Sequence, residues 1–396
     1  MSTSWPPSQV AIVYDRVNTR HGGAEQVLLA LQQIFPQADL ITAVADLQKA
    51  TWAKKFSQVK TSWLQYFPGA AQNHRWLAQF MPLAFESFNL RHYDLVISVS
   101  SAEAKGVLTI PNQLHVSYVL APPRYLYHQQ VELLKANPIT SLPGIYQLAK
   151  KLLKYLTWWD QVAIFRPDVL IPLSLRVTKQ LQTYYHLTSH QIQPVLYPPI
   201  VTQKTYLAAT NFNVPTSPFF LQVGRLVAYK RADLSLKAAA KANLSIIIVG
   251  VGPEKANLVR LIQQLQPQTS AQLTLIGAVR APQLQALYQN CSGVLIPGAE
   301  DFGLTALEAN AAGKPVIIYQ AAGAAEVIKP QRHGLLLKNQ TVSELAQAMQ
   351  SLLKHVWEPQ LLRQNAAKYD TSIFTTELIF RLKLLWKHHQ SQLKTI

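Results

Sequence analysis

Short apolar runs alternate with helical patterns throughout the second half of the chain, and this order constrains the fold most. The apolar runs have the length of β-strands and lie at residues 219–223, 245–250, 272–276, 293–296 and 316–319. Stretches with helical periodicity lie between them, at residues 231–242, 254–264, 282–289 and 303–312. Strands that are apolar along their whole length, each followed by a helix, indicate a parallel sheet with helices on both faces. The second half is therefore predicted to be a doubly wound α/β domain.

The first half shows the same order of elements less regularly. Strand candidates lie at residues 10–14, 39–44, 95–99, 116–119 and 169–171, and helical stretches at residues 24–35, 145–166 and 174–185. Tyr197-Pro198-Pro199 is stiff and breaks helices, so we place the domain linker there. We expect two doubly wound, Rossmann-like domains, residues 1–197 and 198–371, facing each other across a cleft. A last helix of about residues 372–396 is expected to pack back on the first domain.

The charge of the chain limits its possible partners. There are 37 basic and 20 acidic residues, and the formal charge is +17. Such an excess suits nucleic acid, an anionic membrane surface or a phosphorylated substrate. Residues 1–200 hold 17 basic and 10 acidic residues, and residues 201–396 hold 20 and 10, so the excess is spread over both halves. Because no basic arm stands out, the sequence argues against nucleic acid.

Composition also indicates the compartment. Hydrophobic residues make up 49% of the chain, which excludes wholesale disorder. The single cysteine, Cys291, excludes an internal disulfide and a zinc site built from several cysteines. No stretch has the pattern of a signal peptide, and no apolar run reaches the ~20 residues that span a bilayer. We expect a cytoplasmic protein, either free or peripheral on the inner face of the membrane.

Two cations follow the first predicted strand of the second half. Arg225 comes directly after Gly224 at the end of the strand, and Lys230 stands where the next helix is about to begin. Two cations that converge at the end of a strand suit a diphosphate. The alternative is ordinary solvated surface charge, but the position after a buried strand favours a binding loop.

The loop at residues 297–308 carries two carboxylates eight positions apart. Glu300 lies in the loop, and Glu308 lies in the helix expected to begin near Gly303. Amides at the start of a helix can hold an anion, whereas carboxylates accept hydrogen bonds from sugar hydroxyls. The combination suits a nucleotide sugar. The alternative is a capping acid followed by a glutamate on the helix surface.

Taken together, the motifs resemble the family-4 retaining glycosyltransferases of GT-B fold. The resemblance runs over about residues 10–379 and is most specific in the two glutamates with Glu300-Asp301-Phe302-Gly303. Within the family it is closest to the WbaZ-type mannosyltransferases of polysaccharide assembly. Matches to that subgroup include Gly22-Gly23-Ala24-Glu25, Pro122-Pro123-Arg124-Tyr125-Leu126 and Trp159-Asp160.

The resemblance implies an activity and a set of roles. A hexose, best identified as mannose, would move from a nucleotide diphosphate sugar to a glycan or lipid-linked acceptor with retention of configuration. Residues 1–197 would take the acceptor side and residues 198–371 the donor. The catalytic residues implied are Glu300, Arg225 and Lys230, and the donor-binding residues implied are Gly23, Gly224, Asp301, Phe302, Gly303, Leu304 and Glu308. No metal or other cofactor is implied, and the sequence contains no Asp-x-Asp motif of the GT-A class.

One position departs from the family. Members usually carry a histidine before the Pro-Pro-Arg-Tyr stretch, where it contacts the donor sugar, but Leu120 stands there in this chain. The change indicates another donor, a slower enzyme, or a GT-B-like protein that binds nucleotide sugar or glycan with little turnover.

A basic and aromatic cluster lies in the helical stretch of the first half. It consists of Lys150, Lys151, Lys154, Tyr155, Trp158 and Trp159. On a helix this mixture is typical of an element at a membrane interface. The alternative is a packed helix, which we prefer for the tryptophans, while the lysines are candidates for contact with an anionic membrane.

Overall fold

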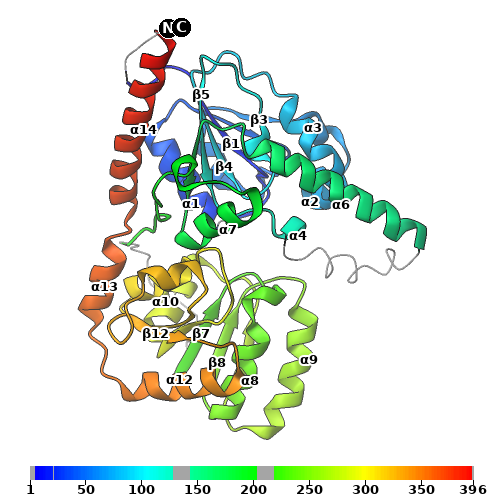
Figure 1. Ribbon diagram of the computed structural model, residues 1–396. Coiled ribbons are helices and arrows are strands. Elements are labelled where there is room, and N and C mark those ends of the chain that lie inside the picture. Colours follow the sequence, from blue (N-terminus) through cyan, green and yellow to red (C-terminus); the bar gives the residue numbers. More distant parts are fainter. Residues whose placement is uncertain (1–4, 21, 128–142, 203–217, 395–396) are drawn as a thin grey trace. The chain divides into compact units, whose positions relative to one another are not determined.

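The protein was analysed as a computed structural model that describes residues 5–20, 22–127, 143–202 and 218–394 (Figure 1). Two compact units are present. The first consists of Met1–Pro199 together with Phe374–Ile396, and the second of Ile200–Ile373. Among the described residues, no helix is both long enough and apolar enough to cross a membrane.

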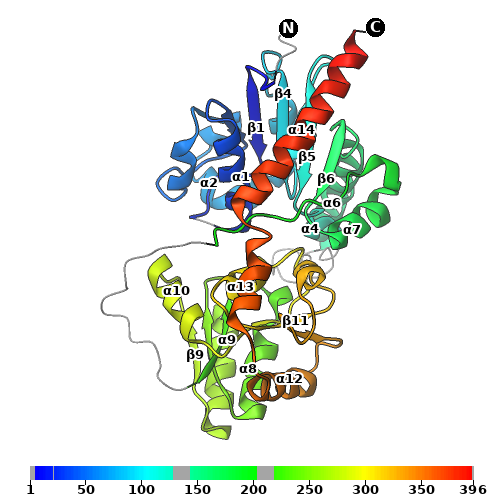
Figure 2. The same cartoon turned by 90° about the vertical axis from the view of Figure 1, so that its left-hand side faces the viewer.

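The first unit is built on a six-stranded parallel sheet. In spatial order its strands are β3 (Val59–Thr61), β2 (Asp39–Thr42), β1 (Val10–Tyr14), β4 (Leu95–Ser100), β5 (Leu114–Val119) and β6 (Val169–Pro172). Its helices are α1 (Gly23–Ile34), α2 (Ala70–Asn73), α3 (Met81–Glu86), α4 (Arg124–Tyr127), α6 (Pro143–Ala163), α7 (Leu175–Tyr185) and α14 (Thr371–Leu393). Helices α1 and α14 lie on one side of the sheet, and α2, α3 and α6 on the other (Figures 1 and 2).

Apolar side chains of the strands pack beneath these helices. Val13 of β1 and Val96 of β4 belong to a buried cluster that Met81 and Phe85 of α3 complete. On the other side, Tyr118 of β5 contacts Phe374 of α14 edge to face at a centroid distance of 6.0 Å. Strands buried on both faces explain why their sequences read as continuous apolar runs.

The second unit repeats this architecture. In spatial order its strands are β12 (Gly334–Leu337), β11 (Val316–Tyr319), β10 (Gly293–Ile296), β7 (Phe219–Val223), β8 (Ser245–Val249) and β9 (Leu273–Ile276), all parallel. Its helices are α8 (Ala232–Ala242), α9 (Lys255–Leu265), α10 (Ala281–Asn290), α11 (Thr305–Ala311), α12 (Val342–Lys354) and α13 (Pro359–Ala367). Short 3-10 helices join elements of both units: η1 (Thr51–Lys55), η2 (Trp63–Tyr66), η3 (His74–Phe80), η4 (Ala104–Gly106), η6 (Ser189–Gln191), η7 (Ala228–Lys230), η8 (Gln266–Gln268) and η9 (Gly323–Val327).

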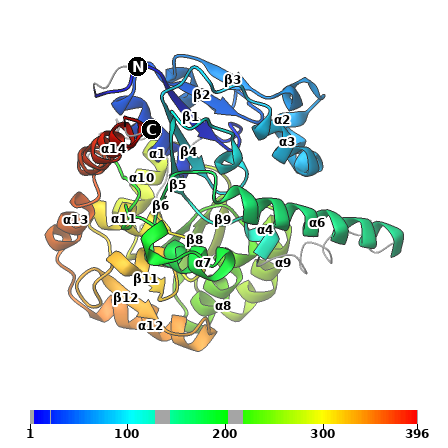
Figure 3. The ribbon, with the colours of Figure 1, turned by 45° about the horizontal axis from the view of Figure 1, so that its top comes forward.

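Both sheets have the same topology. Counted from the first strand of each unit, the spatial order is 3-2-1-4-5-6, the order of a doubly wound fold. The predicted α/β class with two doubly wound domains is therefore confirmed. The strand order reverses between β1 and β4 in the first unit, which lie side by side in Figure 3, and between β7 and β10 in the second. Ligands of such sheets bind beyond the carboxyl ends of the strands at these switch points.

The structure corrects one helix boundary that bears on the candidate site. The sequence predicts a helix from residue 303, but α11 begins at Thr305. Gly303 has a φ of +104°, outside the helical region, so the helix cannot include it. Glu308 is consequently the fourth residue of α11 and lies in its first turn.

Candidate functional site

The candidate site of the second unit lies at its switch point. Lys230 ends η7, in the loop that follows β7, and Glu300 lies in the loop that follows β10. The Lys230 Nζ donates a hydrogen bond to the Glu300 Oε2 at 2.7 Å, and the two side chains are only 15% and 13% exposed. The two loops predicted to bind the donor are thus joined by an ion pair.

Close backbone packing holds the two loops together. At Gly298 a Cβ atom would collide with the carbonyl oxygen of Tyr229, so only glycine lets the β10 loop pass against the turn that carries Lys230. The side-chain amide of Gln222 in β7 donates to the Lys230 carbonyl oxygen at 2.9 Å. The Glu300 carbonyl oxygen accepts the Gly323 N–H at 2.9 Å, which ties the β11 loop to the same place. The position of the ion pair is therefore fixed by three strand-end loops.

Glu308 is oriented by a buried tyrosine. The Tyr288 hydroxyl, from α10, donates a hydrogen bond to the Glu308 Oε2 at 2.9 Å. Burial and the neighbouring Glu308 charge raise the pKa of Tyr288 well above its ordinary value, so the phenol keeps its proton. Tyr288 could not be predicted from the sequence, because nothing at position 288 distinguishes a partner of Glu308 from another core tyrosine of an amphipathic helix.

The segment between the two glutamates presents backbone donors. Among the described residues, no group accepts a hydrogen bond from the amides of Gly303 or Leu304. Phe302 is buried and anchors the segment, and Asp301 beside it is partly buried. Unused amides next to a lysine are groups that an anion can bind.

Not every predicted residue joins this arrangement. Gly224 does, since a Cβ atom there would lie 2.8 Å from the Lys230 Nζ. Arg225 is exposed, and no described contact links it to Lys230 or Glu300. Gly23 belongs to the first unit, where it is the exposed first residue of α1.

The described residues do not suggest a metal centre. No group of three or more His, Cys, Asp or Glu side chains within the described ranges is placed to hold a metal ion. Cys291 is buried at the end of α10, and burial raises the pKa of its thiol to about 12.

The part of the chain that carries this site is similar to a known protein family. Residues 207–369 match the family model for glycosyl transferases group 1. The match spans most of the second unit, Ile200–Ile373. Lys230, Glu300 and Glu308 all lie within the matched residues.

Curated relatives are similar to parts of the chain. An uncharacterized glycosyltransferase of Methanocaldococcus jannaschii is 30% identical over 153 residues, which cover 37% of this chain and 39% of that protein. A D-inositol 3-phosphate glycosyltransferase of Rhodococcus opacus is 27% identical over 226 residues, which cover 53% of this chain and 50% of that protein. The chain thus spans half or less of the length of these relatives.

Solved structures agree with the fold over nearly the whole chain. Sucrose-phosphate synthase of Thermosynechococcus elongatus aligns with a TM-score of 0.69 at 18% identity, covering 98% of this chain and 99% of the other. Anabaena HepE in complex with UDP aligns with a TM-score of 0.62 at 17% identity, covering 94% and 99%. The lipopolysaccharide outer core galactosyltransferase WaaB aligns with a TM-score of 0.61 at 16% identity, covering 96% and 99%. These similarities confirm the predicted GT-B fold.

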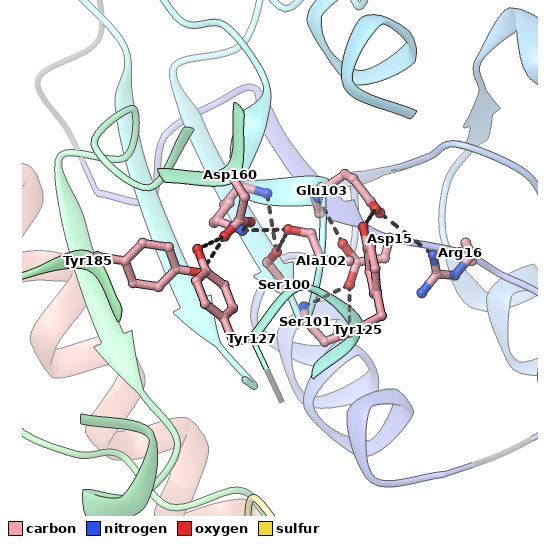
Figure 4. Close-up of polar contacts among 12 residues, drawn as sticks. Asp15, Arg16, Ser100, Ser101, Ala102, Glu103, Tyr125, Tyr127, Asp160 and Tyr185 are labelled. Carbon is pink, nitrogen blue, oxygen red and sulfur yellow. Dashed lines mark hydrogen bonds and ion pairs between the residues drawn. The ribbon is translucent and has the colours of Figure 1, made fainter. Parts of the chain in front are cut away.

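The first unit has its own polar cluster (Figure 4). Asp15 and Arg16 follow β1, and Glu103 lies in the loop after β4. Asp15 accepts hydrogen bonds from the Ser101 N–H at 2.7 Å and from the Ala104 N–H at 2.8 Å. This cluster was not predicted from the sequence, although a carboxylate and a cation directly after a predicted strand were a visible signal.

A second buried group supports the cluster from α6. Lys105 forms an ion pair with Asp160 of α6, and the two side chains are 3% and 2% exposed. The hydroxyls of Tyr127 and Tyr185 donate to the other oxygen of Asp160 at 2.8 and 2.7 Å. These bonds fix α6 against the loop that carries Glu103, as Figure 4 shows.

Leu120 stands at the end of β5 in the same unit. Its backbone N–H donates to the Ser100 carbonyl oxygen at 2.8 Å, and its side chain is partly exposed. An aliphatic side chain can neither donate nor accept a hydrogen bond, so this position offers a ligand only apolar contact.

Proposed function

We propose that the protein is a retaining glycosyltransferase. It would move a hexose, mannose in our proposal, from a nucleotide diphosphate sugar to a glycan or lipid-linked acceptor in polysaccharide assembly. The observation that carries the proposal is the Lys230–Glu300 ion pair at the switch point of the unit that matches the glycosyl transferases group 1 model, with Glu308 held nearby on α11.

The donor would bind through charges of opposite sign. An ammonium group has three N–H donors, and Glu300 takes one of them in the structure, so Lys230 can hold Glu300 and a diphosphate together. The amides of Gly303 and Leu304 would add donors to the phosphate, and Glu308 would accept hydrogen bonds from the ribose hydroxyls. Glu300 would contact the donor sugar. We also assign Arg225 and Gly23 to the diphosphate, and Gly224, Asp301 and Phe302 to the donor loop.

The reaction would break the bond between the sugar and the diphosphate. Negative charge develops on the departing diphosphate, and fixed cations and amides stabilise such charge where it forms. In this proposal Lys230 supplies the charge stabilisation directly, and the transfer needs no metal. The acceptor oxygen would bond to the anomeric carbon on the face that the diphosphate leaves, which retains the configuration, and the hydroxyl proton would pass to the departing diphosphate.

The donor is tested by release of nucleotide from a panel of GDP and UDP sugars. Measurements are made with the whole chain, with and without a lipid-linked acceptor. HepE was solved with UDP, and curated relatives include D-inositol 3-phosphate glycosyltransferases, so UDP sugars belong in the panel beside GDP-mannose. Nucleotide release from GDP-mannose that rises when acceptor is present would support mannose as the transferred sugar. Nucleotide release from another donor alone would replace mannose by the sugar of that donor.

Leu120 favours a second candidate function. With a leucine where the resemblance places a histidine, the chain could bind nucleotide sugar or glycan with little turnover. The two candidates differ in nucleotide release, because a binding protein retains donor affinity without accelerating release. The variant Leu120→His sharpens the comparison. A rise in turnover would show that the position acts at the reaction centre, and an unchanged rate would remove the only support for the second candidate.

An anionic membrane surface is proposed as a further partner. Helix α6 packs inward through Leu153, Leu156 and Trp159. Other apolar side chains of the helix are exposed, namely Leu148, Tyr155, Trp158 and Val162, and so are Lys150, Lys151 and Lys154. Aromatic and aliphatic side chains flanked by lysines suit the boundary between head groups and acyl chains of an anionic bilayer. This contact would place the enzyme peripherally on the inner face of the membrane.

Vesicle co-sedimentation tests the membrane contact. Wild-type protein is expected to sediment with vesicles containing anionic lipid and much less with neutral ones. Replacing Lys150, Lys151 and Lys154 by glutamine should reduce this binding. A matched variant that replaces the exposed Lys237, Lys255 and Lys354 of the second unit loses the same charge and should bind as wild type. Equal binding to neutral and anionic vesicles would contradict the proposed contact with an anionic membrane.

A further inference from the structure

The polar cluster of the first unit occupies that unit's own switch point. Asp15 and Arg16 follow β1, and Glu103 follows β4, just as Lys230 and Glu300 lie in the loops after the first and fourth strands of the second unit. In each unit a cation after the first strand faces a glutamate after the fourth. Since the switch point is where doubly wound sheets bind ligands, the first unit has a second candidate site.

Arg16 and Glu103 form an open pair. The Arg16 guanidinium nitrogen lies 3.6 Å from the Glu103 Oε2, which is beyond hydrogen-bond length. The Glu103 side chain is 4% exposed and that of Arg16 is 26% exposed. Tyr125 donates to the other carboxylate oxygen at 2.7 Å, but among the described residues no group donates to the Oε2. A buried carboxylate oxygen therefore lacks a hydrogen-bond donor beside a partly exposed guanidinium. Figure 4 shows the two side chains facing each other.

The charges around this pair oppose an anionic ligand. Asp15 and Glu103 bring two carboxylates to one guanidinium. Both oxygens of Asp15 already accept hydrogen bonds, from the backbone and from the Ser101 hydroxyl at 2.9 Å. A phosphate could accept from Arg16, but it would bring further negative charge beside two carboxylates. A neutral group that both accepts and donates a hydrogen bond therefore complements the open pair.

We propose that Arg16 and Glu103 bind a neutral sugar ring of the acceptor. One hydroxyl of the ring accepts a hydrogen bond from Arg16 and donates one to the Glu103 Oε2, which satisfies both groups at once. Tyr125 acts as a positioning residue, because its hydroxyl holds the Glu103 carboxylate with the free oxygen toward Arg16. The inference rests on the proposed function only where it calls this sugar the acceptor.

The contrast with the second unit supports this assignment. Lys230 and Glu300 lie within hydrogen-bond distance at 2.7 Å, so that carboxylate oxygen already has its donor. The first-unit pair has the same placement in its sheet but leaves its oxygen unsatisfied. The two switch points therefore differ in ligand, with a charged group at one and a hydroxyl at the other.

Saturation-transfer NMR with the whole chain tests the inference directly. The probes are the methyl α-glycosides of glucose, mannose and galactose, each measured without donor. At least one should give a signal with wild-type protein. Arg16→Met, which keeps the side-chain length, and Glu103→Gln, which keeps the shape, should each weaken that binding about tenfold or more, because each removes a hydrogen bond to a charged group. The matched variant Arg91→Met changes another exposed arginine of the same unit and should bind as wild type.

Two results would overturn the inference. One is glycoside binding that is absent in wild type or unchanged in both Arg16→Met and Glu103→Gln. The other is binding of glucose 6-phosphate at least tenfold tighter than the methyl glucoside, with the gain lost in Arg16→Met, since the site would then select an anion. Calorimetry with GDP and UDP on the same proteins keeps the proposed donor function separate. Nucleotide binding that survives in these variants shows that the donor site is intact whatever the glycosides do.

Discussion

Lys230 and Glu300 are 70 positions apart in the sequence, yet the Lys230 Nζ lies 2.7 Å from the Glu300 Oε2. The pair joins the loops of two neighbouring parallel strands, β7 and β10. Both side chains are largely shielded from solvent, so neither is an ordinary surface charge. An ion pair between two strand-end loops gives the candidate site a fixed cation and a fixed carboxylate before any ligand arrives.

Replacing Lys230 by alanine should slow turnover far more than it weakens nucleotide binding. The lysine is proposed to stabilise charge that develops on the departing diphosphate, and loss of one such group lowers kcat by about 100-fold or more. Nucleotide release measures the rate, and calorimetry measures the affinity. The matched variant Lys237→Ala removes an exposed lysine of α8 and should keep full activity. A Lys230→Ala protein with wild-type kcat would contradict the role.

Replacing Glu308 by alanine should weaken nucleotide binding about tenfold or more. A carboxylate that accepts hydrogen bonds from ribose hydroxyls makes charged hydrogen bonds, each worth about 1.5–3 kcal/mol. Calorimetry with GDP and UDP reads the change. An unaltered affinity for both nucleotides would show that Glu308 does not contact the ribose.

Replacing Tyr288 by phenylalanine should also weaken nucleotide binding, but less than Glu308→Ala does. The change deletes only the hydroxyl that donates to the Glu308 Oε2, and we expect affinity for nucleotide to fall by a few fold. A double-mutant cycle supplies the control. In the Glu308→Ala background, Tyr288→Phe should cost no further affinity, because the group it orients is gone. Additive losses would mean that Tyr288 acts elsewhere.

Breaking the Lys105–Asp160 pair should destabilise the first unit strongly. Removing one partner of a buried pair leaves an uncompensated charge and costs about 3–5 kcal/mol. Lys105→Met is therefore expected to lower the free energy of unfolding in urea by about that amount. Lys60→Met is the control, since Lys60 pairs with Asp39 at 2.7 Å but is 39% exposed, and exposed pairs contribute at most about 1 kcal/mol. Similar losses in the two variants would contradict the expectation.

Asp370 should make stability depend on pH at the acid end. Burial opposes the effect, but hydrogen bonds from Thr202 and Ser372 lower the pKa of Asp370 below its ordinary value. A carboxyl whose folded pKa is lowered stabilises the protein fully above its unfolded pKa of about 4, and this contribution is lost as pH falls through the folded pKa. Asp370→Asn should be less stable than wild type at pH 7 and lose less on acidification. Thermal unfolding of the wild type and of Asp370→Asn is compared from pH 7 to pH 3. An equal loss of stability in the two proteins on acidification would contradict the role of Asp370.

Much of the fold could be predicted because strands of a parallel sheet that are buried on both faces have continuous apolar sequences. Continuous apolar runs such as residues 219–223 and 293–296 correspond to β7 and β10 almost residue for residue. The short strand β3 was not predicted, since it carries Lys60 and none of its residues is fully buried. The strand β12 was missed for a similar reason, because its two middle residues are only partly buried. Strands at the edge of a sheet bury less surface and so leave a weaker sequence pattern.

Residues of the candidate site could be predicted only where they lie in a local sequence motif. Glu300 and Glu308 lie in one motif, and Lys230 lies in another that follows a clear strand. Tyr288 and the pair of Arg16 with Glu103 involve residues brought together by the sheet order, which local periodicity does not reveal. Contacts between side chains far apart in sequence required the structure itself. The roles of the predicted residues in binding and catalysis remain predictions.

Helix α14 has a consequence for the order in which the chain can fold on the ribosome. Its buried residues, from Phe374 to Trp386, complete the face of the first unit that contains Tyr118. The second unit is continuous from residue 200 to residue 373 and can close its core as soon as that stretch has been synthesised. Domains usually fold in their order of synthesis. Here the half that begins first must wait, with the part of its sheet that α14 covers still exposed, until the ribosome has passed the whole of its neighbour.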